Sequence, residues 1–304
     1  MQIPSARSRL RFSIVASSAD EVYPPPVVFS VRRRTWLLAA PLGLLCGLGT
    51  VAGAMRLLGP RQATPVDPAP PCLPARPCLA VVIDDIGRDL RALDALLALP
   101  ADLTFAVLPH AAHTAASREA ILGQGRELLL HLPMDPLDRR HITDEPVVVG
   151  RDDSVARATR RCLEQVPEAV GVNSHMGSAL TQNAAALDAV VGELRASAAS
   201  RRGDRRRTLF VLDSRTTEHS VFCQAARAQG LTCLSRDVFL DDPPARPALT
   251  SAWERALAAA RQRGWAIAVA HPYDSTVEVL RDLLRQRQIR VVRLSRLVGR
   301  LVPT

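Results

Sequence analysis

From Leu79 to the C-terminus, short apolar runs alternate with amphipathic stretches. The runs have the length of buried strands, and the stretches between them carry apolar residues at helical spacing. We expect strands over residues 79–83, 103–108, 127–131, 169–173, 209–213, 231–235, 265–270 and 289–294. We expect helices over residues 88–98, 114–124, 152–165, 182–198, 219–229, 250–263 and 276–287. Strands that alternate with helices predict parallel pairing through right-handed crossovers.

This alternation fits both a closed barrel and an open, doubly wound sheet. The residues at the ends of the expected strands favour the barrel, because nearly every strand ends in a titratable or strongly hydrogen-bonding side chain. They are Asp84, Asp85, His131, Asn173, His175, Asp213, Arg236, Asp237 and His271. In a β/α barrel these ends converge on one face, whereas in an open sheet only the strands beside the switch point share a site. We therefore predict an α/β fold, a distorted (β/α) barrel with seven or eight parallel strands.

The chain before Leu79 lacks this alternation. Residues 36–55 are uncharged, and about 20 such residues cross a bilayer core of ~30 Å. Arg32, Arg33 and Arg34 stand directly before them, so the positive-inside rule places the N-terminus in the cytoplasm. The sequence predicts a single-pass protein of a bacterial inner membrane, with its main domain in the periplasm. Its expected parts are a cytoplasmic tail (1–35), a transmembrane signal-anchor (36–56), a Pro-rich linker (57–78) and the barrel (79–300).

Two alternatives to the signal-anchor stay open. A cleaved signal peptide is the first, because the small residues from Ala52 to Ala54 resemble a cleavage site. The polar region before residue 36 is long for a signal peptide, which favours the anchor. A buried core helix is the second, but Gly43, Gly47 and Gly49 would weaken a helix in water.

Two cysteine pairs are candidate disulfides in an oxidising compartment. Cys72 and Cys78 bracket a Pro-rich loop, and Cys223 and Cys233 bracket a helix-to-strand turn. The sequence gives no Cα separation, so both pairs stay open.

Composition and charge narrow the functional class. The chain is 47% hydrophobic but only 4% aromatic, which suits helices packed on buried parallel strands. The net charge of +9 comes entirely from Arg residues spread along the chain. A nucleic-acid site would concentrate such charge, and the densest run, 201–207, has no aromatic residue to stack on bases. We expect no nucleic-acid partner.

The strand-end residues include a set with metal-ligand chemistry. Asp84 and Asp85 follow the first expected strand, and one of these carboxylates can join His131 and His175. Two imidazoles and a carboxylate suit Zn²⁺ or a similar ion, with one position left for water. The metal would activate that water, the second carboxylate would take its proton, and His271 would protonate a departing amine. Each residue alone also has a structural reading, as turn carboxylate or core histidine, and only their joint placement favours chemistry.

Seven segments carry a family resemblance. They are VVIDDIG (81–87), LTFAVLP (103–109), GRELLLHLPMDP (125–136), VGVNSHMGSALT (170–181), FVLDSRTT (210–217), SRDVFLDD (235–242) and AIAVAHPYDST (266–276). In this order they resemble the divergent polysaccharide deacetylases, a distant branch of the NodB-type carbohydrate deacetylases. The resemblance covers about residues 79–300 and implies a NodB-like distorted barrel.

The resemblance also implies roles for the site residues. Asp85, His131 and His175 would bind the metal, with Zn²⁺ as the expected ion, Asp84 would be the base and His271 the acid. The supporting or substrate-binding residues would be Asn173, Asp213, Arg215 and Arg236. The His-x-x-x-His helix of NodB-type enzymes is absent from this sequence, so the second histidine ligand must come from another strand.

We therefore expect a metal-dependent hydrolase of C–N bonds. Its expected reaction is removal of N-acetyl groups from an envelope polysaccharide, peptidoglycan or another, by metal-activated water. One alternative is a catalytically silent envelope scaffold that binds a glycan or a cell-wall protein. A second is hydrolysis of a different bond by the same site.

Overall fold

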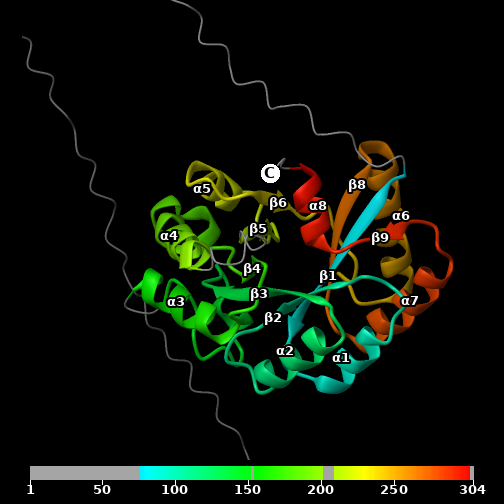
Figure 1. Ribbon diagram of the computed structural model, residues 1–304, viewed down its shortest axis with the longest axis horizontal. Coiled ribbons are helices and arrows are strands. Elements are labelled where there is room, and N and C mark those ends of the chain that lie inside the picture. Colours follow the sequence, from blue (N-terminus) through cyan, green and yellow to red (C-terminus); the bar gives the residue numbers. More distant parts are fainter. Residues whose placement is uncertain (1–75, 152–153, 201–208, 302–304) are drawn as a thin grey trace, which may run out of the picture. The chain divides into compact units, whose positions relative to one another are not determined.

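The computed structural model describes residues 76–151, 154–200 and 209–301. Within these ranges strands and helices alternate along the chain (Figure 1). The strands are β1 Cys78–Ile86, β2 Thr104–Val107, β3 Glu127–Met134, β4 Gly171–Met176, β5 Phe210–Asp213, β6 Cys233–Ser235, β7 Val238–Phe239, β8 Trp265–Ala270 and β9 Arg290–Val291. The α-helices are α1 Leu90–Leu97, α2 Thr114–Gly123, α3 Val155–Gln165, α4 Ala184–Ser200, α5 Phe222–Ala228, α6 Arg246–Arg263, α7 Asp274–Arg285 and α8 Leu294–Leu301. Two short 3₁₀ turns lie at Arg139–His141 and Leu180–Gln182.

The strands form one parallel sheet. Its order is β6-β5-β4-β3-β2-β1-β8-β7, and β9 pairs with β1. The two ends of the order, β6 and β7, are consecutive in the chain. Between them the N–H of Arg236 still bonds to Asp213 O at 3.0 Å, whereas the N–H of Asp237 bonds to Ile267 O at 2.9 Å. One chain segment thus leaves β5 and joins β8.

The parallel α/β arrangement is confirmed, but two details of the expected barrel are corrected. The sheet is a half-barrel, because β6 and β7 are the ends of the ladder and pair with different neighbours. Within the described residues it contains nine strands instead of seven or eight. The eight expected runs are all strands, and β7 is the additional one, since two residues are too short to show a periodic pattern.

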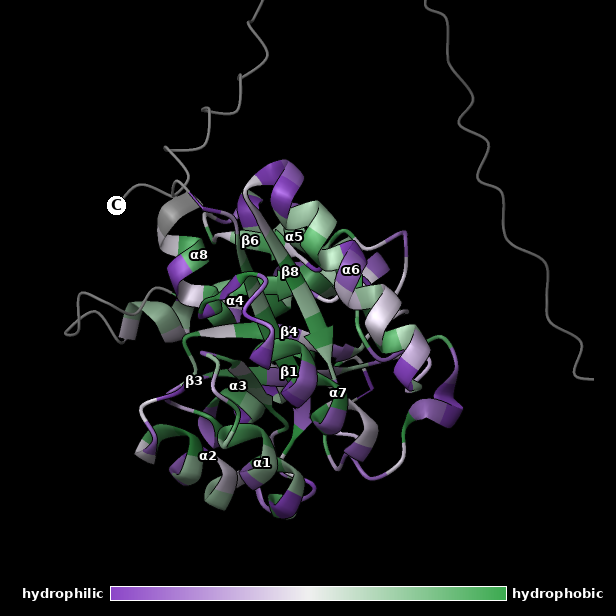
Figure 2. Ribbon diagram, turned by 90° about the vertical axis from the view of Figure 1, so that its right-hand side faces the viewer, coloured by the Kyte–Doolittle hydropathy of each residue, from purple (hydrophilic) through white to green (hydrophobic). Residues whose placement is uncertain are grey.

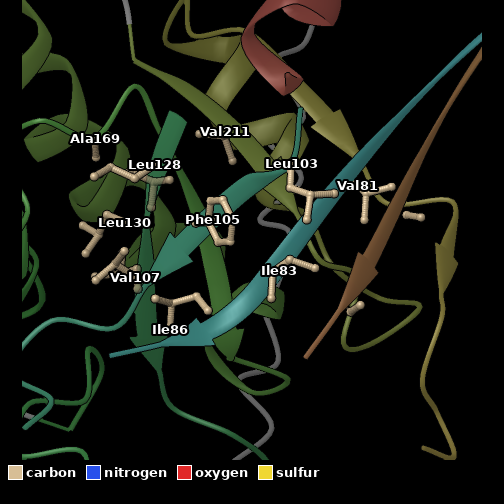
Figure 3. Packing of buried hydrophobic residues seen from close by; sticks show 14 of the residues in the cluster. Val81, Ile83, Ile86, Leu103, Phe105, Val107, Leu128, Leu130, Ala169 and Val211 are labelled. Atoms are coloured by element: carbon tan, nitrogen blue, oxygen red, sulfur yellow. The ribbon is translucent and has the colours of Figure 1, made fainter. Parts of the chain in front are cut away.

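Strand residues alternate between two apolar layers. Val81, Ile83 and Phe105 belong to the layer that packs against the helices (Figure 3). Ala80 and Val82 belong to the other layer, together with Ala106, Leu129, Ile267 and Val269 from neighbouring strands. The strands are mainly hydrophobic, whereas the surrounding helices carry both polar and apolar residues (Figure 2). This pattern is expected for a parallel sheet that is buried on both sides.

The second layer also contains α8, which lies at the N-terminal ends of the strands. Leu294 and Leu297 of α8 are fully buried in that layer. The N–H of Leu294 donates to Thr104 Oγ1 at 3.0 Å, and the N–H of Ser295 donates to Glu127 Oε1 at 3.1 Å. Thr104 and Glu127 are the first residues of β2 and β3. Since α8 covers this end, the site must form at the C-terminal ends of the strands.

Replacing the buried Trp253 should show how much one large side chain of α6 stabilises the fold. Trp253 is 1% exposed, and its Nε1 donates to Gln288 Oε1 at 3.3 Å. We expect Trp253→Ala to lower the free energy of unfolding by about 3–5 kcal/mol, because it leaves a cavity. Urea denaturation measures the change, with Leu122→Ala on an exposed helix face as control. A loss no larger than the control's would contradict the packing described.

The expected inner-membrane location is corrected. In the ranges that the structure describes, no helix is long and apolar enough to cross a membrane. The longest, α6, has 18 residues and carries Glu254 and Arg255 near its middle, which a bilayer core disfavours. Residues 36–56, expected to be the anchor, lie outside the described residues, as do the expected tail 1–35 and most of the linker 57–78.

One of the two candidate disulfides is present. Cys223 of α5 and Cys233 of β6 are bonded, with their Cα atoms 5.2 Å apart. The bond joins the first residue of β6 to the helix that precedes the strand. Cys72 lies outside the described residues, so the pairing of Cys72 with Cys78 is untested.

Candidate metal centre

Asp84 and Asp85 end β1 in unlike backbone conformations. Asp85 has a φ of 57°, in the left-handed region that Asp tolerates better than most residues. Neighbours on a regular strand point to opposite faces, but this bend interrupts the strand. Both carboxylates therefore approach His131, with Asp85 Oδ1 3.1 Å and Asp84 Oδ2 3.8 Å from its Nε2.

His131 and His175 come from adjacent parallel strands. In the register of β3 and β4, His131 lies opposite Asn173, two residues before His175. His175 Nδ1 lies 3.0 Å from Asp85 Oδ1 and 3.1 Å from His131 Nε2. Asp85, His131 and His175 thus offer ligand atoms that all lie within 4.8 Å of one another. The structure brings together the three residues that the sequence proposed as ligands.

The hydrogen bonds of the two imidazoles test whether this set fits a metal. His131 Nδ1 lies 2.9 Å from Asn173 Oδ1, and His175 Nε2 lies 3.1 Å from Glu145 Oε1. If these outer nitrogens donate, the inner nitrogens face each other as lone pairs 3.1 Å apart. Such a pair is repulsive unless a cation lies beside it. Two imidazole nitrogens, each with an outer partner, and a carboxylate oxygen are a donor set that fits a divalent ion.

Asn173 also contacts the second carboxylate. Its Nδ2 donates to Asp84 Oδ1 at 2.7 Å while its Oδ1 faces His131. Asp84 is 2% exposed. Burial raises the pKa of Asp84, against the opposing charges of His131 and His271. The carboxyl next to the metal set is therefore a stronger base than an ordinary Asp.

His271 follows β8 and is held by Asp241. Its Nδ1 lies 2.9 Å from Asp241 Oδ1, and its backbone N–H donates to Asp241 Oδ2 at 2.6 Å. The rings of Phe239 and Tyr273 lie beside the imidazole, with centroids 5.8 and 5.6 Å away. Burial alone would lower the pKa of His271, but the hydrogen bond and charge of Asp241, with the charges of Asp84 and Asp85, raise it to about 9. His271 thus carries a proton at neutral pH.

The sequence matches the divergent polysaccharide deacetylase family over residues 81–298, which is most of the chain. The chain belongs to this family. The family resemblance expected from the sequence is therefore confirmed. The name of the family refers to polysaccharides, which are glycans.

The chain is also similar to two relatives and one solved structure. "Uncharacterized protein YibQ" of Escherichia coli is 34% identical over 209 residues, which are 68% of this chain and 62% of the relative. An "Uncharacterized protein" of Haemophilus influenzae is 34% identical over 210 residues, 68% of this chain and 71% of the relative. The match thus spans less than two thirds of the E. coli protein. The crystal structure of "uncharacterized protein ATU2773" from Agrobacterium tumefaciens matches this chain with a TM-score of 0.63 and 22% sequence identity. The match covers 75% of this chain and 92% of that chain, and it shows a shared fold.

In this member of the family, the other expected residues lie around the next strand ends. Asp213 accepts hydrogen bonds from Arg215 N and Ser220 Oγ, each at 2.8 Å, so it shapes its own loop. Arg236 donates to the Ser214 and Arg215 carbonyls and lies 3.6 Å from the centroid of the Phe239 ring. Within the described residues, the hydrogen bond that orients Asp84 comes from Asn173 instead.

The sequence missed two carboxylates of the family member's site. Asp241, in the segment SRDVFLDD, accepts hydrogen bonds from His271 and from Thr276 Oγ1. The pair of adjacent acidic residues at the end of this segment, Asp241 and Asp242, was a signal that could have found it. Glu145 lies in the loop between β3 and α3, which has no periodicity, and no feature of the sequence distinguished it from its neighbour Asp144.

Proposed function

We propose that this chain is a metal-dependent hydrolase that removes N-acetyl groups from a polysaccharide. The observation that carries the proposal is the Asp85–His131–His175 set beside a buried carboxylate, Asp84, with a protonated imidazole, His271, near both carboxylates. Family membership supports a glycan as the substrate class. An envelope polysaccharide such as peptidoglycan is the substrate we propose, and Zn²⁺ is the ion we propose because of the two imidazole ligands.

The proposed reaction breaks an amide bond with one water molecule. When bound to Asp85, His131 and His175, the divalent ion would supply Lewis acidity toward water and the acetyl carbonyl. Asp84 takes the proton of the attacking water, and its raised pKa suits that role. The water oxygen bonds to the acetyl carbon, the C–N bond breaks, and His271 gives its proton to the departing nitrogen. The products are acetate and a free amine on the sugar.

Two supporting residues hold these groups in the proposed reaction. Asn173 holds the Asp84 carboxylate at 2.7 Å, and Asp241 holds the His271 ring at 2.9 Å. The guanidinium of Arg236 lies over the Phe239 ring, and this ring in turn lies beside His271. We assign Arg215, which is exposed, and Arg236 to substrate contact.

The test pairs metal analysis with acetate release. The full chain is purified without added zinc, its metal content is measured, and it is incubated with chitooligosaccharides and peptidoglycan fragments. We expect one divalent ion per chain and acetate release that a chelator abolishes. A metal-bound protein that releases no acetate from any polymer would contradict deacetylation. A metal-free, inactive protein that still binds the glycan would favour the silent scaffold.

The pH dependence of acetate release tests the acid. His271 acts while protonated, so the rate should fall as pH rises through about 9. Asp241→Asn removes the charge that raises this pKa, and we expect the falling limb to move toward the ordinary histidine value of 6.5. Tyr273 also lies beside the His271 ring. The charges of Asp84 and Asp85 remain in this variant and should keep the pKa of His271 partly raised. A pH profile of kcat/KM measures the limb, with the exposed neighbour Asp242→Asn as control. An unmoved limb in Asp241→Asn would show that His271 is not the acid.

A further inference from the structure

Glu145 reaches the metal set from a loop that the proposed reaction does not use. Its side chain is only 4% exposed, and its Oε1 lies 3.1 Å from His175 Nε2. The same oxygen is paired with the guanidinium of Arg88, which also pairs with Asp144 at 3.0 Å. The carboxylate of Glu145 is thus fixed between Arg88 on one side and the outer nitrogen of His175 on the other.

His175 therefore has a carboxylate at each of its two ring nitrogens. Asp85 Oδ1 lies 3.0 Å from Nδ1, and Glu145 Oε1 lies 3.1 Å from Nε2. A neutral imidazole has one N–H, so it can donate to only one of them. Donation to Asp85 would place the hydrogen on Nδ1, where it would occupy the lone pair that a metal needs. Donation to Glu145 leaves that lone pair free.

We propose that Glu145 is a positioning residue that selects the Nε2–H tautomer of His175 and so prepares Nδ1 as a metal ligand. The inference rests on the metal site of the proposed function. Asn173 has the corresponding place behind His131, where its Oδ1 lies 2.9 Å from Nδ1. Each imidazole of the set thus has an outer acceptor, and only that of His175 has a charged one. Arg88 holds this carboxylate in place.

Zinc affinity is the direct readout of this role. Removing the outer partner of a metal-bound histidine typically weakens metal binding by about 10–100-fold. We expect a loss of about this size in Glu145→Ala, and a smaller loss in Glu145→Gln, whose amide oxygen can still accept from Nε2–H. Metal-free full-length protein is titrated with Zn²⁺ by calorimetry against a competing chelator.

The matched control removes a carboxylate that pairs with arginine but with no histidine. Glu193 on α4 accepts from Arg160 Nε at 3.0 Å and Nη2 at 2.7 Å. Glu193→Ala should keep the zinc affinity of the wild type. Thermal unfolding of the metal-free variants shows whether each is folded. If Glu145→Ala is not folded, the zinc affinity of the nearly isosteric Glu145→Gln tests the proposal.

A second readout separates tautomer selection from general loosening of the site. Imidazole ¹⁵N shifts of the folded, metal-free protein, recorded above the His175 pKa of about 9 so that the ring is neutral, report which nitrogen carries the hydrogen. We expect Nε2–H in the wild type and a shift toward Nδ1–H in Glu145→Ala. Wild-type zinc affinity in folded Glu145→Ala would overturn the inference while leaving the metal site in place. A wild-type protein that takes up no divalent ion would overturn the proposed function as well.

Discussion

Asp84→Asn should lower the rate of acetate release by about 10²–10⁴-fold, the usual contribution of a general base. The asparagine oxygen can still accept from Asn173, whose Nδ2 lies 2.7 Å from the present carboxylate. The amide cannot take a proton from water, so chemistry is lost while packing is kept. The three ligands Asp85, His131 and His175 are unchanged, and we expect normal metal content.

The rate of acetate release and the metal content of the Asp84→Asn protein are measured on the same sample. Asp94→Asn, on an exposed position of α1, controls for the loss of one negative charge. A variant at position 84 that works as fast as the wild type would remove Asp84 as the base. A variant that loses its metal would instead make Asp84 a ligand.

Asp85→Asn should release the metal. Although burial opposes ionisation, the contacts with His131 and His175 in the metal-free site hold the pKa of Asp85 well below its usual range, so it is a carboxylate facing two imidazoles. It is the one anionic member of the ligand set. We expect metal affinity to fall by more than the ~10–100-fold that an outer partner contributes, and acetate release to fall with it.

Asparagine is the suitable replacement, because it tolerates the φ of 57° at this position. Calorimetric zinc titration measures the affinity, and the neighbouring Asp84→Asn variant is the matched control. Excess zinc should restore part of the activity of Asp85→Asn, since the two histidines remain. Unchanged metal affinity in Asp85→Asn would contradict the ligand set.

Much of the fold could be predicted because short apolar runs alternate regularly with amphipathic stretches from Leu79 onward. The run 265–270 is β8 residue for residue, and each expected helix is present with shifted ends. Two elements were missed for physical reasons. β7 has two residues, below the length at which alternation is visible. α8 begins at Leu294, inside an apolar run that the pattern assigned to a strand.

The meeting of Asp85, His131 and His175 could be predicted because parallel strands place their C-terminal ends on one face. Of the residues behind these three, Asn173 was among the predicted supporting residues, but Glu145 was not. Glu145 lies in a loop whose path depends on tertiary contacts with Arg88 and His175, and sequence spacing does not encode such a path. The direction of Asp213 toward Ser220 likewise depends on a local turn. Strand periodicity thus predicts which side chains gather, but not which loops close behind them.

The left-handed backbone at Asp85 limits which residues can replace it without strain. Most side chains with a Cβ are strained there, so the substitutions that cost the fold least are asparagine and glycine. Both would abolish the anionic ligand while sparing the architecture. A family member with asparagine or glycine at the equivalent position would therefore keep this backbone bend but lack the anionic group of the proposed metal set.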